Sequence, residues 1–137
     1  MAAGSREPHH HARLSHFLSR IDDLAGAETA IRQAVALAPG DANLRRVLVG
    51  ILDRDGRYDE ALAAVREMIA AGMRDEDALG WLGHLVAWTG NLAGAAAAFR
   101  QAVDMAPMQS RFRLALADTL DRDGRAGVPL DGGQARR

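Results

Sequence analysis

Apolar residues recur along this chain at spacings of three and four, between short polar segments. In ANLRRVLVGILDRDG, residues 42–56, they share one side of a helix: Leu44, Val47, Leu48, Ile51 and Leu52. YDEALAAVREMIAAG, residues 58–72, has the same spacing: Tyr58, Ala61, Leu62, Val65, Met68 and Ile69. Asp41 is placed to cap the first helix, and Gly56 can take the left-handed backbone that ends it. The pattern predicts two helices joined by a tight turn.

A similar helix pair is predicted on each side. Downstream, Asp75 starts a helix, Gly90 interrupts the pattern, and Asn91 can cap the helix in LAGAAAAFRQAVDMA. Upstream, the second helix has a regular apolar stripe: Leu24, Ala27, Ile31, Ala34 and Val35, followed by Pro39. The first helix there is weaker, because His11 stands where a larger apolar residue would pack better.

These pairs are copies of one unit, since shifting the chain by 34 residues aligns like with like. The aligned columns are Leu14, Leu48, Leu82 and Leu116; Leu18, Leu52, Val86 and Leu120; Gly56, Gly90 and Gly124; Ala27, Ala61 and Ala95; Ile31, Val65 and Phe99; and Ala34, Met68 and Ala102. Small residues allow paired helices to approach closely, so we expect the alanine column to be structural and the leucine columns to form the core.

The motif LDRDGR occurs twice, at 52–57 and 120–125. A calcium loop of the EF-hand type needs oxygen ligands at alternating positions and a glycine at its sixth position, whereas Gly56 comes three residues after Asp53. We therefore interpret both copies as the end of a helix, closed by glycine. In the last unit, Pro129 occupies the alanine column and would break a second helix. This predicts one terminal helix over 110–123, which caps the array, and a disordered tail over 124–137.

Composition narrows the function. The 137 residues are 48% hydrophobic but only 4% aromatic, which suits closely packed helices. The 17 basic and 18 acidic residues give a charge of −1, which argues against a dedicated nucleic-acid or membrane-surface binder. There is no cysteine, so disulfides, thiolate metal sites and cysteine nucleophiles are excluded. With no signal peptide or long apolar run, we expect a cytoplasmic protein.

The repeating pattern resembles the tetratricopeptide repeat. WLGHLVAWTGNLAGAAAAFRQAVDMAP matches it best, through Leu82, Gly83, Gly90, Ala95, Phe99, Ala102 and Pro107. Departures are Met73 in place of proline, Asp22 in place of the inter-helix glycine, and Leu79 or Arg45 where tryptophan is frequent. The resemblance implies an all-α, right-handed α-solenoid of three repeats, 8–41, 42–75 and 76–109, after a flexible N-terminus over 1–7 and before the capping helix.

The resemblance also implies a concave groove lined by the first helix of each repeat. The residues expected to line it are His9, Ala12, His16, Asn43, Arg46, Gly50, Asp53, Asp77, Gly80, His84, Trp88, Arg111, Leu114, Asp118 and Asp121. Gly50 and Gly80 would leave room for a ligand. Trp88 is either a hot spot for binding or a packing residue, and Trp81 is expected to pack.

One known binding mode is not expected. Family members that hold acidic chaperone tails use lysine, asparagine and arginine on successive first helices. The matching positions here lack that set: Ala12, His16, Val47, Asp77 and Trp81. We predict weak or no binding of such tails.

Two classes of function compete. The resemblance favours a non-catalytic scaffold or adaptor that binds a peptide or helix of a protein partner; the alternative is a regulatory or assembly module of a larger enzyme system, such as a transferase. Catalysis by the chain itself would rest on His84 with Asp118 or Asp53, without any accompanying catalytic motif. We therefore expect no catalytic residues and no cofactor.

Two further features have alternative interpretations. His9, His10, His11 and His16 could bind zinc or nickel, but a metal site needs three or four converging ligands, so a solvated first turn begun by Pro8 is favoured and no metal is expected. Self-association through Phe112, Leu114 and Leu116 is a third idea, and we expect a monomer or a weak homodimer.

Overall fold

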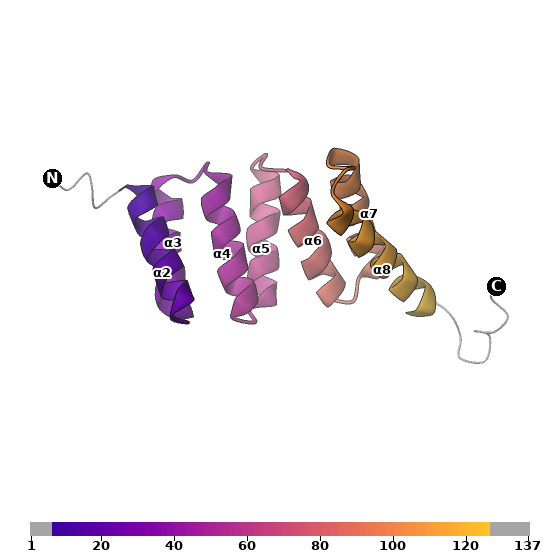
Figure 1. Cartoon of the computed structure of the whole chain (residues 1–137), viewed down its shortest axis with the longest axis horizontal. Helices are drawn as coiled ribbons and strands as arrows, with labels where there is room; N and C mark the ends of the chain where they lie inside the picture. Colours follow the sequence, from indigo (N-terminus) through magenta and orange to yellow (C-terminus); the bar gives the residue numbers. More distant parts are fainter. Residues whose placement is uncertain (1–6, 127–137) are drawn as a thin grey trace. The chain divides into compact units, whose positions relative to one another are not determined.

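A computed structural model describes residues 7–126, and in this range the chain is entirely helical, with no strand (Figure 1). Its seven helices in chain order are α2 (Pro8–Arg20), α3 (Leu24–Leu37), α4 (Ala42–Arg54), α5 (Tyr58–Ala70), α6 (Glu76–Trp88), α7 (Leu92–Met105) and α8 (Ser110–Ala126). None of them is both long enough and apolar enough to cross a lipid bilayer. The segments assigned to a flexible start and a disordered tail lie outside the described residues, apart from Glu7 and residues 124–126.

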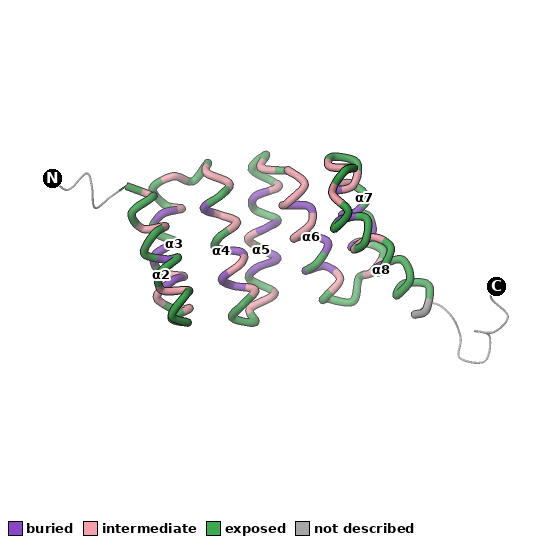
Figure 2. Tube along the Cα trace, viewed as in Figure 1, coloured by how far each residue is buried: buried purple, intermediate pink, exposed green. Residues whose placement is uncertain are grey.

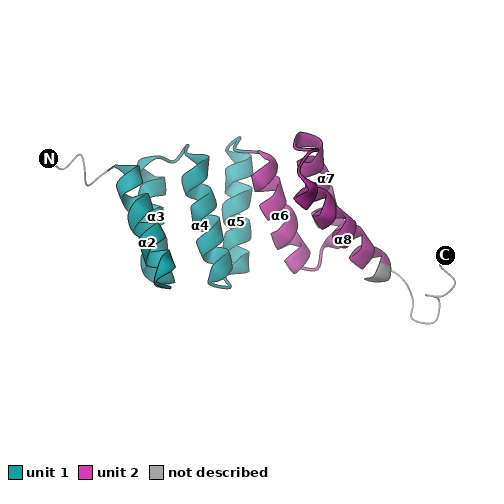
Figure 3. Ribbon diagram, viewed as in Figure 1, with its two compact units in different colours: residues 1–73 teal, residues 74–137 magenta. Residues whose placement is uncertain are grey.

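The chain divides into two compact units, residues 1–73 and 74–137 (Figure 3). In the first unit α2 pairs with α3, α3 packs on α4, and α4 pairs with α5. In the second unit α6 pairs with α7, and α8 packs on α7. The helix pairs predicted from the 34-residue period are therefore present in both units.

The predicted helix starts are confirmed by their side-chain caps. The Asp41 carboxylate accepts hydrogen bonds from the backbone N–H of Asn43 at 3.0 Å and of Leu44 at 3.4 Å. Asp75 accepts from Ala78 at 2.8 Å, and Asn91 accepts from Gly94 at 2.9 Å. These bonds satisfy backbone donors that the first helical turn leaves unpaired.

The turns inside the helix pairs need a left-handed residue. Gly56 and Gly90 have φ of 78° and 95°, as their position in the pattern predicts. Asp22 occupies the same column in the first pair, and its φ is 67°. It is the only non-glycine residue with positive φ among residues 7–126, so this turn forms without the freedom that glycine provides.

The prediction that LDRDGR ends a helix is correct for one copy and wrong for the other. The first copy ends α4, with Asp55 as its C-cap. The second copy lies inside α8, which continues through Asp123 and Gly124 to Ala126. The terminal helix is thus longer than the predicted 110–123. Only the first copy is followed by a described helix, α5, that packs back on the helix before it.

Buried residues occur on each of the helix pairs (Figure 2). The alanine column that was predicted to be structural is fully buried, and so are two further columns of the repeat: Ala27, Ala61 and Ala95; Ile31, Val65 and Phe99; Ala34, Met68 and Ala102. The prediction of buried leucine columns is only partly right. Leu48, Leu52 and Val86 are buried, but Leu14 is 45% exposed and Leu120 is 40% exposed. These two lie on α2 and α8, the first and last described helices, which have fewer neighbours to cover them.

Each helix pair fills its core with a different combination of volumes. In α6 and α7, the Phe99 ring lies so close to Gly83 that a Cβ there would be 2.7 Å from a ring carbon. The matching positions hold Val49 with Val65 in the second pair. In the first pair they hold Ser15 with Ile31, and the buried Ser15 hydroxyl donates to the Ala27 carbonyl at 2.8 Å. Small and large residues therefore compensate within a pair, as dense packing requires.

An ion cluster joins α3 to the turn before α5 in the first unit. Arg57 donates from Nε to Glu60 Oε1 at 2.6 Å and from Nη2 to Glu28 Oε2 at 3.3 Å, and Arg32 Nε lies 2.7 Å from Glu28. The Arg57 hydrogen bond is the largest influence on the Glu28 carboxyl and lowers its pKa; the same arginine lowers the pKa of Glu60. The Glu28 side chain is only 15% exposed, so its charge depends on these partners.

Candidate functional site

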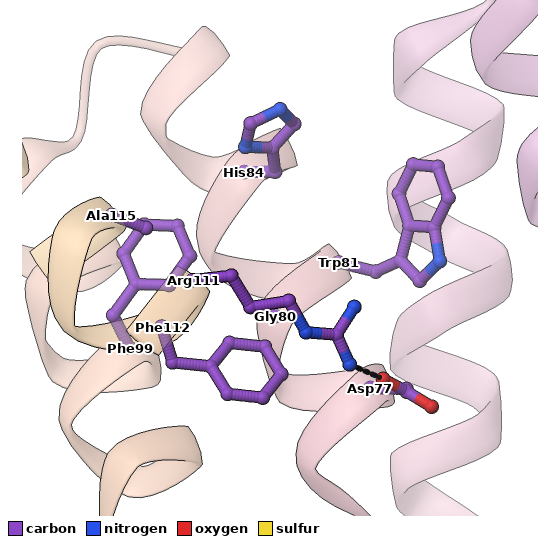
Figure 4. A pocket seen from close by; sticks show the side chains of 8 residues that line it. All are labelled: Asp77, Gly80, Trp81, His84, Phe99, Arg111, Phe112 and Ala115. Atoms are coloured by element: carbon purple, nitrogen blue, oxygen red, sulfur yellow. Dashed lines mark hydrogen bonds and ion pairs between the residues drawn. The ribbon is translucent and has the colours of Figure 1, made fainter. Parts of the chain in front are cut away.

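The second unit contains a pocket of about 320 Å³ between α6 and α8 (Figure 4). Its lining residues come from α6, α7 and α8: Asp77, Gly80, Trp81, His84, Phe99, Arg111, Phe112 and Ala115. Four of these, Asp77, Gly80, His84 and Arg111, are among the residues that the sequence predicted to line a groove. The structure brings these four together around one hollow.

Helical spacing explains how α6 and α8 line the pocket. Asp77, Gly80 and His84 are three and four residues apart, so they share one face of α6. Phe112 of α8 lies against Gly80, and a Cβ on Gly80 would be 2.7 Å from the ring. The missing side chain of Gly80 therefore lets the Phe112 ring lie directly on α6. Buried Phe112 and Phe99 supply an aromatic floor.

Arg111 spans the rim of the pocket. Its Nη2 donates to Asp77 Oδ1 at 2.6 Å, and its Nε donates to Gln109 Oε1 at 2.8 Å. Its guanidinium carbon lies 4.5 Å from the centroid of the Phe112 ring, within cation–π range. Figure 4 shows the side chain extended past Phe112 toward Asp77. The cation is thus held by three contacts although its side chain is 60% exposed.

Polar groups occur at the rim and apolar groups at the floor. His84 is exposed, and Figure 4 shows its imidazole projecting away from the two phenylalanine rings. Trp81 is half-buried. In the same view, its side chain and that of Asp77 lie on the same side of Gly80. An aromatic floor with a few fixed polar groups is the usual composition of a site that binds ligands or side chains.

Part of this lining is not expected from the sequence. There, Phe99 marks only a column of the repeat, Phe112 belongs to the self-association idea, Trp81 is expected to pack, and Ala115 has no expected role. Phe112 is in fact buried against its own chain, so its assignment to an exposed self-association surface is wrong. The sequence signal for this pocket is the glycine pair Gly80 and Gly83 on α6. Because glycine has no side chain, Gly80 leaves room for the Phe112 ring and Gly83 leaves room for the Phe99 ring.

The predicted residues of α4 lie in the first unit. Asn43 and Arg46 are one turn apart, and Arg46 Nη2 donates to Asn43 Oδ1. Gly50 and Asp53 follow on the same helix and are half-buried, and the space that a Cβ on Gly50 would enter is open. His16 is exposed on α2.

The remaining predicted residues do not join the pocket. Trp88 is 54% exposed at the end of α6. Asp118 pairs with Arg122 on α8 at 3.8 Å. No hydrogen bond joins His84 to Asp118 in the described part of the second unit. Within residues 7–126, no three His, Asp or Glu side chains are grouped to hold a metal ion.

Comparisons with known proteins agree with this architecture. The family described as tetratricopeptide repeat matches residues 18–76 and 82–127. Among curated proteins, cellulose synthase operon protein C of Pseudomonas fluorescens (strain SBW25) is 31% identical over 120 residues. That alignment covers 81% of this chain but only 9% of the relative, so the chain spans a small part of that protein's length.

Several solved structures share the fold at low sequence identity. The structure of pilF from Pseudomonas aeruginosa has a TM-score of 0.79 at 20% identity, over 88% of this chain and 55% of that one. YrrB, described as a TPR protein with an unusual peptide-binding site, has a TM-score of 0.73 at 18% identity, over 88% and 62%. MamA from Desulfovibrio magneticus RS-1 has a TM-score of 0.75 at 21% identity, over 87% and 67%.

Proposed function

Because the chain belongs to the tetratricopeptide repeat family, we propose that it is a non-catalytic scaffold that binds a segment of a protein partner through the faces of its first helices. The family generally supplies interaction modules without catalytic activity. The partner segment is an extended peptide or a helix, and the pocket between α6 and α8 receives its anchoring side chain.

The pocket is the observation that carries this proposal. At about 320 Å³ it falls at the small end of ligand sites, roughly 300–1,000 Å³, which suits one large side chain better than a whole cofactor. The rings of Phe99 and Phe112 favour an aromatic or aliphatic side chain. Such buried anchors account for most of the affinity in typical protein interfaces.

The polar groups at the rim of the pocket would orient the bound partner segment. Arg111 already neutralises Asp77, so the pair offers the partner its remaining donors and acceptors without a net charge. His84 adds an exposed imidazole that can donate or accept a hydrogen bond. We expect the partner's backbone or polar side chains near the anchor to use these groups.

In the first unit, Asn43, Arg46, Gly50 and Asp53 would give a second contact on α4. The Arg46 to Asn43 hydrogen bond presents a cation and an amide on one exposed helical turn. This set resembles the rim of the pocket in chemistry but has no aromatic floor, so we expect it to contribute specificity more than affinity.

The test is peptide selection followed by variant binding. A displayed library of random peptides is selected against the immobilised chain, and the dissociation constant of each selected peptide is measured by calorimetry. We expect Ala115→Trp, which fills the pocket, and Arg111→Ala, which opens its rim, to weaken binding by about tenfold or more. Arg100→Ala, on the exposed side of α7, is the matched control and should bind as the wild type does.

Equal affinity for Ala115→Trp and the wild type, with helicity unchanged, would exclude the pocket as the anchor site. Loss of binding in Asn43→Ala or Arg46→Ala, with Ala115→Trp unaffected, would move the site to α4. Trp88→Ala tests the exposed tryptophan separately, because it lies outside the pocket.

A second candidate is an assembly or regulatory module of a larger enzyme system. The observation that favours it is the 31% identity to cellulose synthase operon protein C, a name that places that relative with a synthase. The chain would then bind a synthase subunit. Co-purification of a tagged chain with the synthase from the native host, and its loss in Ala115→Trp, would support this role; an unchanged yield in the variant would argue against the pocket as the contact.

A further inference from the structure

Arg111 presents a flat cation whose plane is already held in place. A guanidinium group donates hydrogen bonds only within its own plane. Nη2 donates to Asp77 Oδ1 at 2.6 Å, and Nε donates to Gln109 Oε1 at 2.8 Å. Two of the three nitrogens are thus engaged within the chain, on two different edges of the plane. The orientation of the plane is therefore set before any ligand arrives.

Phe112 covers one of the two faces of this plane. The guanidinium carbon lies 4.5 Å from the centroid of the Phe112 ring, which is the only ring in cation–π range of it among residues 7–126. In Figure 4 the Phe112 ring and the His84 imidazole lie on opposite sides of the Arg111 side chain, and all three residues line the pocket. Because 60% of the Arg111 side chain is exposed, an occupant of the pocket can meet the face turned away from Phe112.

The chemistry of that open face selects among possible occupants. The faces of a guanidinium carry no hydrogen-bonding group, and arginine characteristically stacks them on aromatic rings. A carboxylate in the pocket would be repelled by Asp77, and a second cation would be repelled by Arg111. An aliphatic side chain would fill the space but would gain only from burial. An uncharged aromatic ring gains from burial and from stacking.

We propose that the pocket takes an aromatic side chain of the partner segment, which stacks on the open face of Arg111 so that the guanidinium lies between this ring and Phe112. The inference rests on the proposed function, since the same pocket anchors the partner, and it names the class of anchor. Because Asp77 and Gln109 already hold the plane, stacking orders little additional side chain and costs little entropy. Arg111 is then the residue that makes the pocket prefer aromatic over aliphatic anchors.

The experiment compares two probes that differ only in their ring, N-acetyl-phenylalaninamide and N-acetyl-cyclohexylalaninamide. The rings are similar in size and the cyclohexyl ring is the more hydrophobic, so burial alone would favour the cyclohexyl probe. Each probe is titrated into the full chain, and binding is followed by NMR. We expect the wild type to bind the phenyl probe at least about threefold more tightly. The ring current of the phenyl probe should also shift the Arg111 Nε–H resonance.

Variants of Arg111 test the origin of this preference. Arg111→Lys keeps the charge but removes the planar face, so it should lose the preference while its affinity for the cyclohexyl probe stays nearly unchanged. Arg113→Lys is the matched control and should keep the preference. Arg113 is exposed on the same helix, donates to the Pro107 carbonyl and lies outside the pocket lining. Arg111→Met is the second variant if Arg111→Lys loses helicity by circular dichroism.

Three results would overturn the proposal. The first is a wild-type chain that binds both probes equally or prefers the cyclohexyl probe. The second is a preference for the phenyl probe that persists in both Arg111→Lys and Arg111→Met. The third is a phenyl probe that does not bind at about 10 mM, since a preformed pocket should hold a molecule of this size with a millimolar dissociation constant.

The failure of this proposal can be told apart from the failure of the proposed function. Selected peptides that lose affinity in Ala115→Trp but bind through a leucine or another aliphatic anchor would support the scaffold function and overturn the aromatic anchor. A phenyl probe that binds with the expected preference, while no peptide is selected, would support the aromatic site and contradict the binding of a partner segment.

Discussion

Asp77 and Arg111 occupy equivalent positions in consecutive repeats, 34 residues apart, and form an ion pair with 2.6 Å between Oδ1 and Nη2. The same column holds His9 and Asn43 in the earlier repeats. One position of the repeat thus carries four different polar residues, and a charge pair forms where the third and fourth copies meet.

Breaking this pair should affect binding more than stability. Both side chains are partly exposed, at 39% and 60%, and an exposed ion pair contributes about 0–1 kcal/mol. We expect Asp77→Ala to change the free energy of unfolding in urea by less than about 1 kcal/mol. A loss well above that range would mean that the pair supports the packing of α8.

Gly83→Ala should destabilise the second unit. The new Cβ would lie 2.7–2.9 Å from three carbons of the buried Phe99 ring, and overpacking of this kind typically costs about 1–3 kcal/mol. Gly50→Ala is the matched control, because nothing lies within 4 Å of its added Cβ; it should gain up to about 1 kcal/mol from helix propensity. Chemical denaturation measures both. If Phe99→Leu does not relieve the effect of Gly83→Ala, the steric explanation is incorrect.

Asp22→Gly should stabilise the first unit. Asp22 has φ of 67°, a conformation that costs a residue with a Cβ roughly 1–2 kcal/mol and glycine almost nothing. The substitution removes an exposed pair with Arg54 at 3.6 Å, which is worth little. We expect a net gain of about 0.5–1 kcal/mol by thermal or urea unfolding. Asp22→Ala, which keeps a Cβ, is the control and should show no gain; an equal gain in both would point away from the backbone.

The stability contributed by Glu28 should depend on pH. Hydrogen bonding to Arg57 lowers the pKa of the folded carboxyl below 4.5, its value in an unfolded chain. Between those two values the unfolded state binds more protons, so stability rises with pH there. The contribution is complete above about pH 4.5 and is lost as the pH falls through the lower, folded pKa.

Glu28→Gln should therefore be less stable than the wild type at pH 7, and the difference should shrink at acid pH. Urea unfolding at a series of pH values measures this. Glu67→Gln is the control. The Glu67 carboxylate is 75% exposed and lies as far as 4.0 Å from Arg45, so this variant should differ little from the wild type at any pH. A pH-independent deficit in Glu28→Gln would show that packing, and not charge, is responsible.

Local signals predicted the helices and their starts well. The side chains of Asp41, Asp75 and Asn91 cap the helices that the sequence assigned to them, because a cap contacts only its own first turn. The period of 34 also predicted that the alanine column is structural, and Ala27, Ala61 and Ala95 are all fully buried.

Features that depend on neighbouring helices were not predictable in this way. The identical segment LDRDGR ends α4 at its first copy and continues α8 at its second, so its own residues do not decide the outcome. Leu14 and Leu48 share a column, yet only Leu48 is buried. The pocket also escaped prediction in part, because Phe112 and Gly80 approach each other from different repeats.

The volume match inside each helix pair has a consequence for how this array can change over generations. Gly83 accommodates Phe99, Val49 accompanies Val65, and Ser15 accompanies Ile31. A genetic crossover that falls between pairs keeps every match, so whole pairs can be duplicated or exchanged. A crossover that joins the first helix of one pair to the second helix of another would set Val49 against Phe99, or Gly83 against Ile31. The heritable building block of this protein is therefore the matched helix pair, not the single helix.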